Sequence, residues 1–151
     1  MNRLLLIPSS CILTSLALVT SASAQLYWDT NGATAGAGNP ADGTWDAATT
    51  NWSTDSSGSI ATGAYVEGSD VVFSAGSDAA TANITVSGTQ SVSSLSIEEG
   101  DVTIGGNNID DSSGTVTVSV ASGASGTINS SMTFNANFDV DGELFVQSVG
   151  S

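Results

Sequence analysis

Carboxylates are the main chemically active side chains of this sequence. Asp139, Asp141 and Glu143 occupy alternate positions, and such alternation along one extended strand would place three carboxylates on one face. Three carboxylates on one face can bind a hard cation such as Ca²⁺. The EF-hand calcium loop, however, requires a Glu six residues after its glycine, and Ser148 stands at that distance from Gly142. We therefore expect these three side chains to be solvated acids and not metal ligands.

Two further acidic groups lead to the same expectation. Glu98, Glu99 and Asp101 form one group, and Asp110 with Asp111 forms the other. Paired carboxylates can catalyse glycoside hydrolysis, in which one acid protonates the leaving group and the other attacks or activates water. A chain with 15 acidic residues contains many such pairs by chance. We predict no catalytic residue, no metal site and no cofactor site, and keep a calcium-stabilised passenger as a third alternative.

Three tryptophans, Trp28, Trp45 and Trp52, are the other candidate binding groups. An indole face makes broad contact with the CH groups of a sugar, so exposed tryptophans would indicate a carbohydrate-binding surface. Buried tryptophans would instead form a cap, because the terminal units of a stacked-strand fold need a cover. We favour the cap and keep a secreted carbohydrate-binding module as the alternative function.

The charge balance excludes several classes of function. The formal net charge is −14, with 15 acidic residues, one basic residue, one cysteine and no histidine. Histidine, cysteine and lysine supply most general bases and nucleophiles, so a conventional enzyme is not expected. A surface without cations also repels phosphate groups, which excludes nucleic acids and anionic membranes as direct partners.

Residues 1–24 are typical of a cleavable signal peptide. Arg3 supplies a positive start, an apolar stretch follows, and Ala22 and Ala24 are small residues of the kind that a signal peptidase recognises. The apolar stretch is interrupted by Pro8 and is shorter than the ~20 residues that span a bilayer. Cys11 is interpreted as hydrophobic filler. We expect a secreted or cell-surface protein that contains no basic residue and no cysteine after cleavage.

Short extended segments dominate the sequence from residue 69 onward. Apolar and small polar residues alternate in each segment, which places the apolar side chains on one face of a strand. No convincing helical period follows the signal peptide, so the fold class is predicted to be all-β. Residues 31–43 contain several glycines and a proline and predict a long surface loop. The expected strands are 71–73, 84–86, 92–97, 102–104, 116–120, 132–134, 138–140 and 144–146.

Two architectures fit strands at this spacing. Asp141-Gly142 suits a type I′ turn between strands 138–140 and 144–146, which favours an antiparallel β-sandwich. Most other segments are separated by clusters of small polar residues without such a pair, including Gly105-Gly106, which we interpret as a turn. Stacked parallel strands tolerate small polar corners around an interior of Val, Ile and Leu. We favour a parallel β-helix and keep the antiparallel β-sandwich as the alternative.

Three tryptophan motifs precede the strand segments: Tyr27-Trp28-Asp29, Thr44-Trp45-Asp46 and Thr50-Asn51-Trp52. Together with the strand segments that begin at Asp70-Val71-Val72-Phe73, they resemble the start of bacterial proteins with autotransporter-associated β-strand repeats. The resemblance covers nearly the whole chain after the signal peptide, and it implies a large exported passenger folded as a right-handed parallel β-helix. The resemblance also implies that such a passenger is sometimes followed by an outer-membrane barrel or a short sorting tail. We therefore expect this sequence to be the first part of a longer protein.

Three regions are predicted along the chain. They are a signal peptide at 1–24, a Trp- and Gly-rich N-terminal cap region at 25–68 and a β-strand repeat region at 69–151 that we expect to be truncated. The predicted function is that of an exported, non-catalytic structural or adhesive surface protein. Cell-surface glycans or other surface proteins are the expected partners. An uncapped last rung would expose backbone groups and apolar side chains, which predicts self-association.

Overall fold

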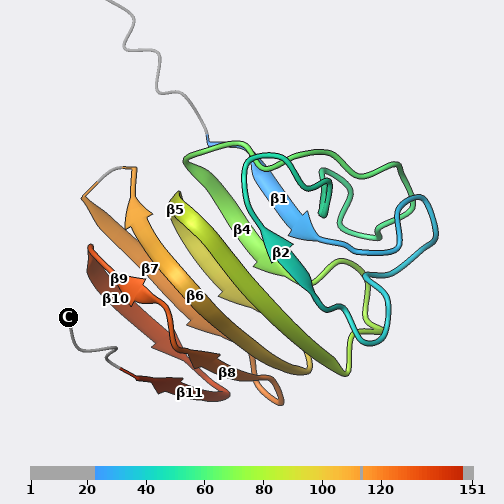
Figure 1. Cartoon of the computed structure of the whole chain (residues 1–151). Helices are drawn as coiled ribbons and strands as arrows, with labels where there is room; N and C mark the ends of the chain where they lie inside the picture. The colour runs from blue at the N-terminus through green and yellow to red at the C-terminus, as the bar shows by residue number, and fades with distance from the viewer. Residues whose placement is uncertain (1–22, 113, 148–151) are drawn as a thin grey trace, which may run out of the picture.

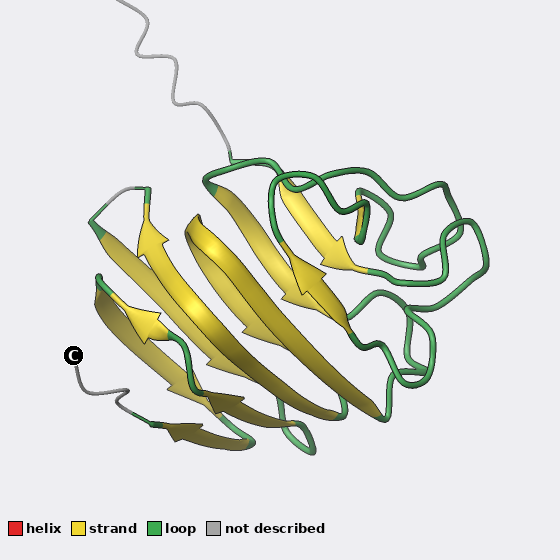
Figure 2. Cartoon of the chain, viewed as in Figure 1, coloured by secondary structure: helices red, strands yellow, loops and turns green. Residues whose placement is uncertain are grey.

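A computed structural model describes residues 23–112 and 114–147 of the chain. Residues 1–22 of the predicted signal peptide, which include Arg3 and Cys11, lie outside the described residues. Within the described ranges all regular structure is β-strand, and loops connect the strands (Figure 2). No helix in these ranges is long and apolar enough to span a bilayer.

The strands wind into a parallel β-solenoid of about three turns (Figure 1). On one side, β4, the second half of β5, β7 and β10 pair in parallel, and on another side the first half of β5, the first half of β6, β8 and β11 do the same. The prediction of a parallel β-helix is confirmed. The strands are β1 (Gln25–Trp28), β2 (Gly43–Trp45), β3 (Trp52–Ser53), β4 (Ser69–Phe73), β5 (Thr81–Ile97), β6 (Asp101–Asp111), β7 (Thr115–Val120), β8 (Ser125–Ile128), β9 (Ser131–Met132), β10 (Asn135–Val140) and β11 (Glu143–Val146).

The antiparallel β-sandwich is wrong for this chain. Between the described strands, antiparallel pairing is confined to β1 with β3. The Asp141-Gly142 pair does not form a hairpin turn, because β10 pairs with β7 and β11 pairs with β8. The backbone N–H groups of Asp141 and Gly142 both donate to the carbonyl of Val120. This segment is therefore a corner that carries the chain from one side of the solenoid to the next.

Gly105-Gly106 is also not a turn between strands. Both residues lie inside β6, and the register between β5 and β6 shifts at this level. Gly106 has a φ of +102°, a backbone conformation that glycine adopts without a Cβ clash. The strand thus bends around a corner without ending.

Apolar side chains stack in register to form the core. Val71, Leu95 and Val118 occupy equivalent positions on three successive parallel strands, and each is 0 % exposed. Ile84, Ile104 and Ile128 form a similar column on another side. Each fully buried side chain of this size contributes about 1.5–3 kcal/mol of transfer free energy. Because the period-two pattern points every second residue inward, the repeated strands produce continuous aliphatic columns.

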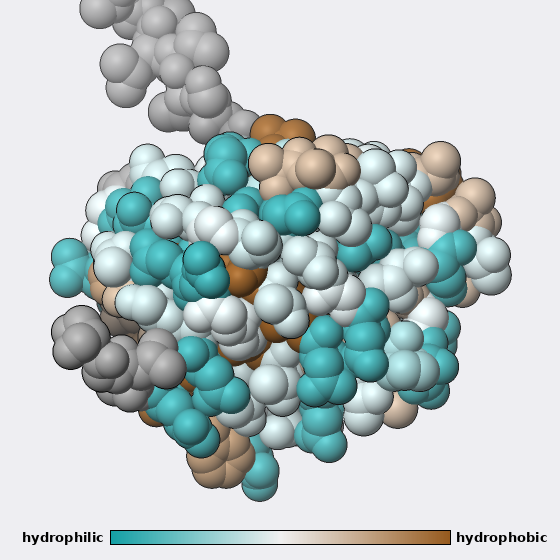
Figure 3. Space-filling view, viewed as in Figure 1, coloured by the Kyte–Doolittle hydropathy of each residue, from teal (hydrophilic) through white to brown (hydrophobic). Residues whose placement is uncertain are grey.

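Small polar side chains cover the outward positions. The hydroxyls of Ser96 and Ser119 lie on adjacent strands with their Oγ atoms 2.8 Å apart. The face drawn in Figure 3 is mostly hydrophilic or weakly polar, with hydrophobic patches between such residues. The solenoid therefore separates an aliphatic interior from a serine- and threonine-rich exterior.

Candidate functional site

The three tryptophans are buried as a cap at the N-terminal side of the solenoid. Trp28 and Trp45 are 0 % exposed and Trp52 is 2 % exposed. The ring centroid of Trp52 lies 5.1 Å from that of Trp28 and 5.3 Å from that of Trp45. Tyr65 and Phe73 complete the cluster. Because the indole faces are covered, these tryptophans do not form a sugar-stacking surface.

The loop-rich segment around β1, β2 and β3 holds this cluster in place. The Trp28 indole Nε1–H donates to the carbonyl of Ala41 at 2.7 Å. The backbone N–H of Asp29 donates to the carbonyl of Asn51 at 3.0 Å, which ties the end of β1 to the residue before β3. Figure 2 shows the loops gathered at this side of the solenoid. The cap closes the first end of the aliphatic core.

The acidic residues do not assemble as the sequence suggested. Asp139 lies on β10, Asp141 lies at the corner, and Glu143 starts β11, so the three belong to different sides of the solenoid. The prediction that they project from one strand face is wrong because the strand ends at Val140. Among the residues that the structure describes, no three His, Cys, Asp or Glu side chains form a cluster that could hold a metal ion.

In each of the other two acidic groups, one carboxylate has a local hydrogen-bond partner. A Glu99 carboxylate oxygen accepts a hydrogen bond from the Ser74 hydroxyl at 2.7 Å. The Asp110 carboxylate accepts one from the backbone N–H of Asp111 at 2.8 Å. Glu98 is exposed before the corner, and Asp101 starts β6. These contacts position the corners and strand ends of the solenoid.

The clearest candidate interaction surface is the apolar face of the last described turn. We call it the β10–β11 face and define it by Phe138, Val140, Leu144 and Val146. These four side chains line an open depression of about 570 Å³. Phe138 pairs in register with buried Val118, and Val146 with buried Ile128, so the four residues continue the interior columns.

Exposure distinguishes this turn from those before it. Val71, Leu95 and Val118 are buried completely, but Phe138 at the next position of the same column is 54 % exposed. Val146 follows buried Ile128 and is 44 % exposed. Within residues 23–112 and 114–147, no further layer covers these interior positions as the next turn covers their counterparts in the preceding turns.

The backbone edges of β10 and β11 are also open. In the described part of the chain, β10 pairs with β7 alone and β11 with β8 alone, so each leaves one edge for another strand. Free strand edges beside exposed apolar side chains are a template for further pairing. Asp139 and Glu143 project beside this template and add negative charge to its margin.

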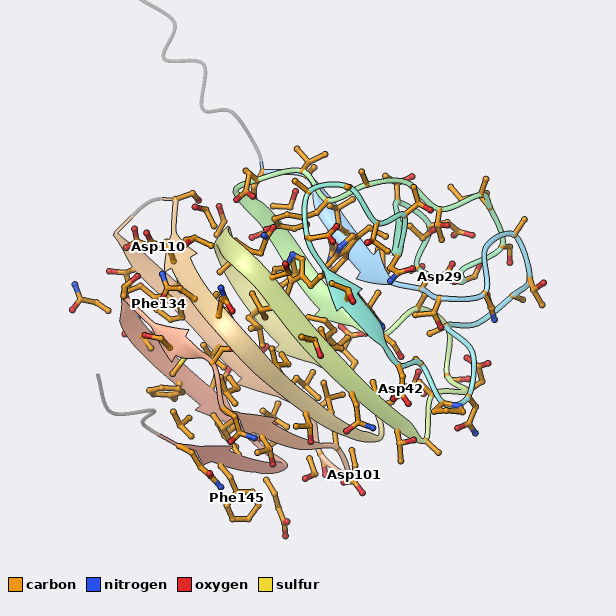
Figure 4. All side chains as sticks on the ribbon, viewed as in Figure 1. Asp29, Asp42, Asp101, Asp110, Phe134 and Phe145 are labelled. Atoms are coloured by element: carbon orange, nitrogen blue, oxygen red, sulfur yellow. The ribbon has the colours of Figure 1, made fainter. Side chains whose placement is uncertain are left out.

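Phe145 provides a contrast on the same strand. It is 55 % exposed, as Phe138 is, but it pairs with Thr127 at an outward position of the ladder. Figure 4 shows its ring projecting away from the body of the protein. Phe145 is therefore a solitary surface aromatic, whereas Phe138 belongs to the uncovered core.

Sequence reasoning placed these residues in strands but did not identify which turn would be uncovered. It also did not single out Asp29, which is 0 % exposed although it is a carboxylate. Its position directly after Trp28, at the end of an apolar strand, was the available signal.

Comparison with models of protein families, with curated proteins and with solved structures finds no match.

Proposed function

We propose that this chain is an exported, non-catalytic structural or adhesive element of a bacterial cell surface, and that it forms the first turns of a longer β-helical passenger of the autotransporter-associated repeat type. The β10–β11 face is the observation that carries the proposal. A solenoid capped at one end and uncovered at the other is organised to be extended by further parallel strands.

The structural role is supported by the way the fold uses its side chains. Aliphatic residues fill the interior, and the outward positions of the ladders are mostly small and polar. The motifs with Trp28, Trp45 and Trp52 stabilise the cap. Without exposed tryptophans, the carbohydrate-binding alternative loses the residues on which it was based.

Export is the second part of the proposal. It rests on the signal-peptide pattern of residues 1–24 and on the acidic composition, which favours solubility outside the cell. The first described strand begins at Gln25, directly after the proposed cleavage position. Amino-terminal sequencing of the exported protein should begin at Gln25, and an intact amino terminus in an intracellular fraction would contradict export.

Self-association of the chain produced as residues 25–151 tests the uncovered face. A second copy is then the available cover for Phe138, Val140, Leu144 and Val146, so we expect concentration-dependent association in analytical ultracentrifugation. Phe138→Asp should shift the protein to the monomer because it places a charge in the apolar depression. Phe145→Asp is the matched control, since this aromatic is equally exposed but points outward.

Two results would contradict the role of this face. One is a wild-type protein that stays monomeric at every concentration tested. The other is equal dissociation by Phe138→Asp and Phe145→Asp, which would indicate a general effect of added charge. Circular dichroism of both variants confirms that each retains its β-structure.

A further inference from the structure

Asp29 is a fully buried carboxylate, and the described residues include no basic side chain that could pair with it. It is 0 % exposed, its Oδ1 accepts the backbone N–H of Asn31 at 3.0 Å, and its buried Oδ2 has no hydrogen-bond partner. The one basic side chain of the sequence, Arg3, lies outside the described residues and in the proposed signal peptide. Buried charges in proteins are normally paired or bound to a metal ion. Asp29 therefore requires either a proton or a cation that the described residues do not supply.

Oxygen atoms converge around the side-chain amide of Asn31. One terminal atom of this amide lies 2.9 Å from Asp29 Oδ1, 2.7 Å from the carbonyl oxygen of Thr34 and 3.0 Å from the carbonyl oxygen of Gly36, and the other lies 3.1 Å from Gly38 N. With its nitrogen toward the three oxygens, the amide has two hydrogens for three acceptors. The three oxygen atoms around the Asn31 amide therefore outnumber its two N–H hydrogens.

Asp78 adds a second carboxylate from another segment of the chain. Its Oδ1 accepts the backbone N–H of Ala37 at 2.8 Å, and a Cβ placed on Gly36 would lie within 2.5 Å of the carboxylate. Burial raises the pKa of Asp29, backbone hydrogen bonds from Asn31 and Gly32 partly offset this, and the charge of Asp78 raises it further. The fold thus brings two carboxylates toward each other from positions 29 and 78.

We propose that Asp29, Asn31 and Asp78, with the carbonyl oxygens of Thr34 and Gly36, bind one Ca²⁺ ion that fastens the 29–38 loop to the solenoid. Ca²⁺ accepts carboxylate, amide and carbonyl oxygens at about 2.3–2.6 Å in flexible geometry. With its oxygen toward the loop, the Asn31 amide would place that atom 2.7–3.0 Å from Asp29 Oδ1 and from the carbonyl oxygens of Thr34 and Gly36, a spacing compatible with neighbouring ligands of one such ion. Mg²⁺ fits less well because it demands a nearly regular octahedron.

The Asn31 amide changes its role between the two states. Without the ion its nitrogen faces the neighbouring oxygens, and with the ion its oxygen does so as a ligand. The site lies in the loops beyond the end of β1, where Figure 4 labels Asp29. It is remote in sequence from Asp139, Asp141 and Glu143, and it is independent of the β10–β11 face.

Thermal unfolding with added salts is the primary test. We expect CaCl₂ to raise the Tm of the 25–151 protein saturably and by several degrees more than NaCl of the same ionic strength, with a smaller effect of MgCl₂. Terbium luminescence sensitised by the adjacent Trp28 should report binding of one ion, and Ca²⁺ should displace it. Equal Tm shifts in CaCl₂ and NaCl, together with no sensitised terbium emission, would overturn the proposal.

Two variants assign the site to these residues. Asp78 is exposed, so Asp78→Asn is expected to fold and to weaken Ca²⁺ binding at least tenfold. Asp42→Asn is the matched control, because Asp42 is also an exposed acid that accepts one backbone N–H, from Asn83 at 2.7 Å. Equal Ca²⁺ affinity in the wild type and in Asp78→Asn would place the ion elsewhere and overturn the assignment.

Asn31→Asp separates an ion ligand from a purely structural hydrogen-bond donor. As a ligand, the new carboxylate keeps an oxygen at the site, so the variant should be destabilised in chelator and recovered by Ca²⁺. As a structural donor alone, Asn31 cannot be replaced by an acid, and Ca²⁺ would not recover the Tm. The second result would overturn the ligand role of Asn31.

Discussion

Trp28 and Trp52 contact each other through both backbone and side chain. Their residues are register partners in the antiparallel β1–β3 ladder, and their indole rings pack edge to face with centroids 5.1 Å apart. This double contact joins two segments that are separated in sequence by the 29–42 loop and β2. It explains how a glycine-rich region with only short strands closes one end of the solenoid.

Trp45→Ala should destabilise the protein strongly and should not reveal a sugar-binding site. Trp45 is 0 % exposed and packs against Trp52, Tyr65 and Phe73. Deleting a buried aromatic of this size costs about 3–5 kcal/mol. The measurement is the free energy of unfolding in urea. Glycan-array binding by the wild type that disappeared in a normally folded Trp45→Ala variant would instead support the carbohydrate-binding function.

Gly100→Ala should destabilise the corner between β5 and β6. Gly100 has a φ of +65°, and an added Cβ would lie 2.2 Å from the carbonyl oxygen of Ala79. Gly123 is the matched control, because its φ is +86° but nothing lies within 4 Å of an added Cβ. We expect about 1–2 kcal/mol of left-handed strain in Gly123→Ala and a clearly larger loss in Gly100→Ala. Equal losses in thermal unfolding would refute the steric part of this prediction.

Asp46→Ala should reduce stability at neutral pH but not in acid. Hydrogen bonds from the backbone N–H groups of Thr49 and Ala48, with a further one from the Thr49 hydroxyl, lower the pKa of Asp46 below its ordinary value. The charged form is therefore favoured in the folded state. Its stabilisation is present above the pKa of the unfolded chain and is lost as the pH falls through the lower folded-state pKa. Urea unfolding of the wild type and of Asp46→Ala across the acid range should show that the difference between their free energies of unfolding shrinks toward low pH.

Association through the β10–β11 face should strengthen with ionic strength. The chain carries a formal charge of −14, and Asp139 and Glu143 lie beside the uncovered strands. Salt screens this repulsion, since the Debye length falls from about 10 Å at 0.1 M to about 3 Å at 1 M. Sedimentation velocity should show a lower dissociation constant at the higher salt concentration. Weaker association in high salt would indicate an interface held by charge attraction.

Local patterns predicted most of the strands because alternation is a property of neighbouring residues. Segments 84–86, 102–104 and 116–120 lie in β5, β6 and β7 as expected.

The corners between strands were less predictable from the sequence. Asp141-Gly142 has the local preference of a hairpin, but parallel pairing of β10 with β7 and β11 with β8 overrides it. Gly105-Gly106 bends a strand that continues, because the ladder with β5 persists on both sides.

The candidate surfaces required the tertiary structure. Phe138 and Phe145 occur in similar alternating segments and are about equally exposed, and only the register of their strands shows that one faces the core and the other the solvent. Asp29 and Asp78 are far apart in sequence, and the packing of the 29–38 loop brings them together.

The sequence by itself determined an acidic, all-β chain whose alternating residues give each strand one apolar face, because side-chain direction follows from the backbone of a single strand. Tertiary structure decided that the strands stack in parallel, that Trp28, Trp45 and Trp52 are enclosed, and that Phe138 is left uncovered. Those outcomes depend on which strands lie above and below each other, and that information is carried by contacts between distant segments.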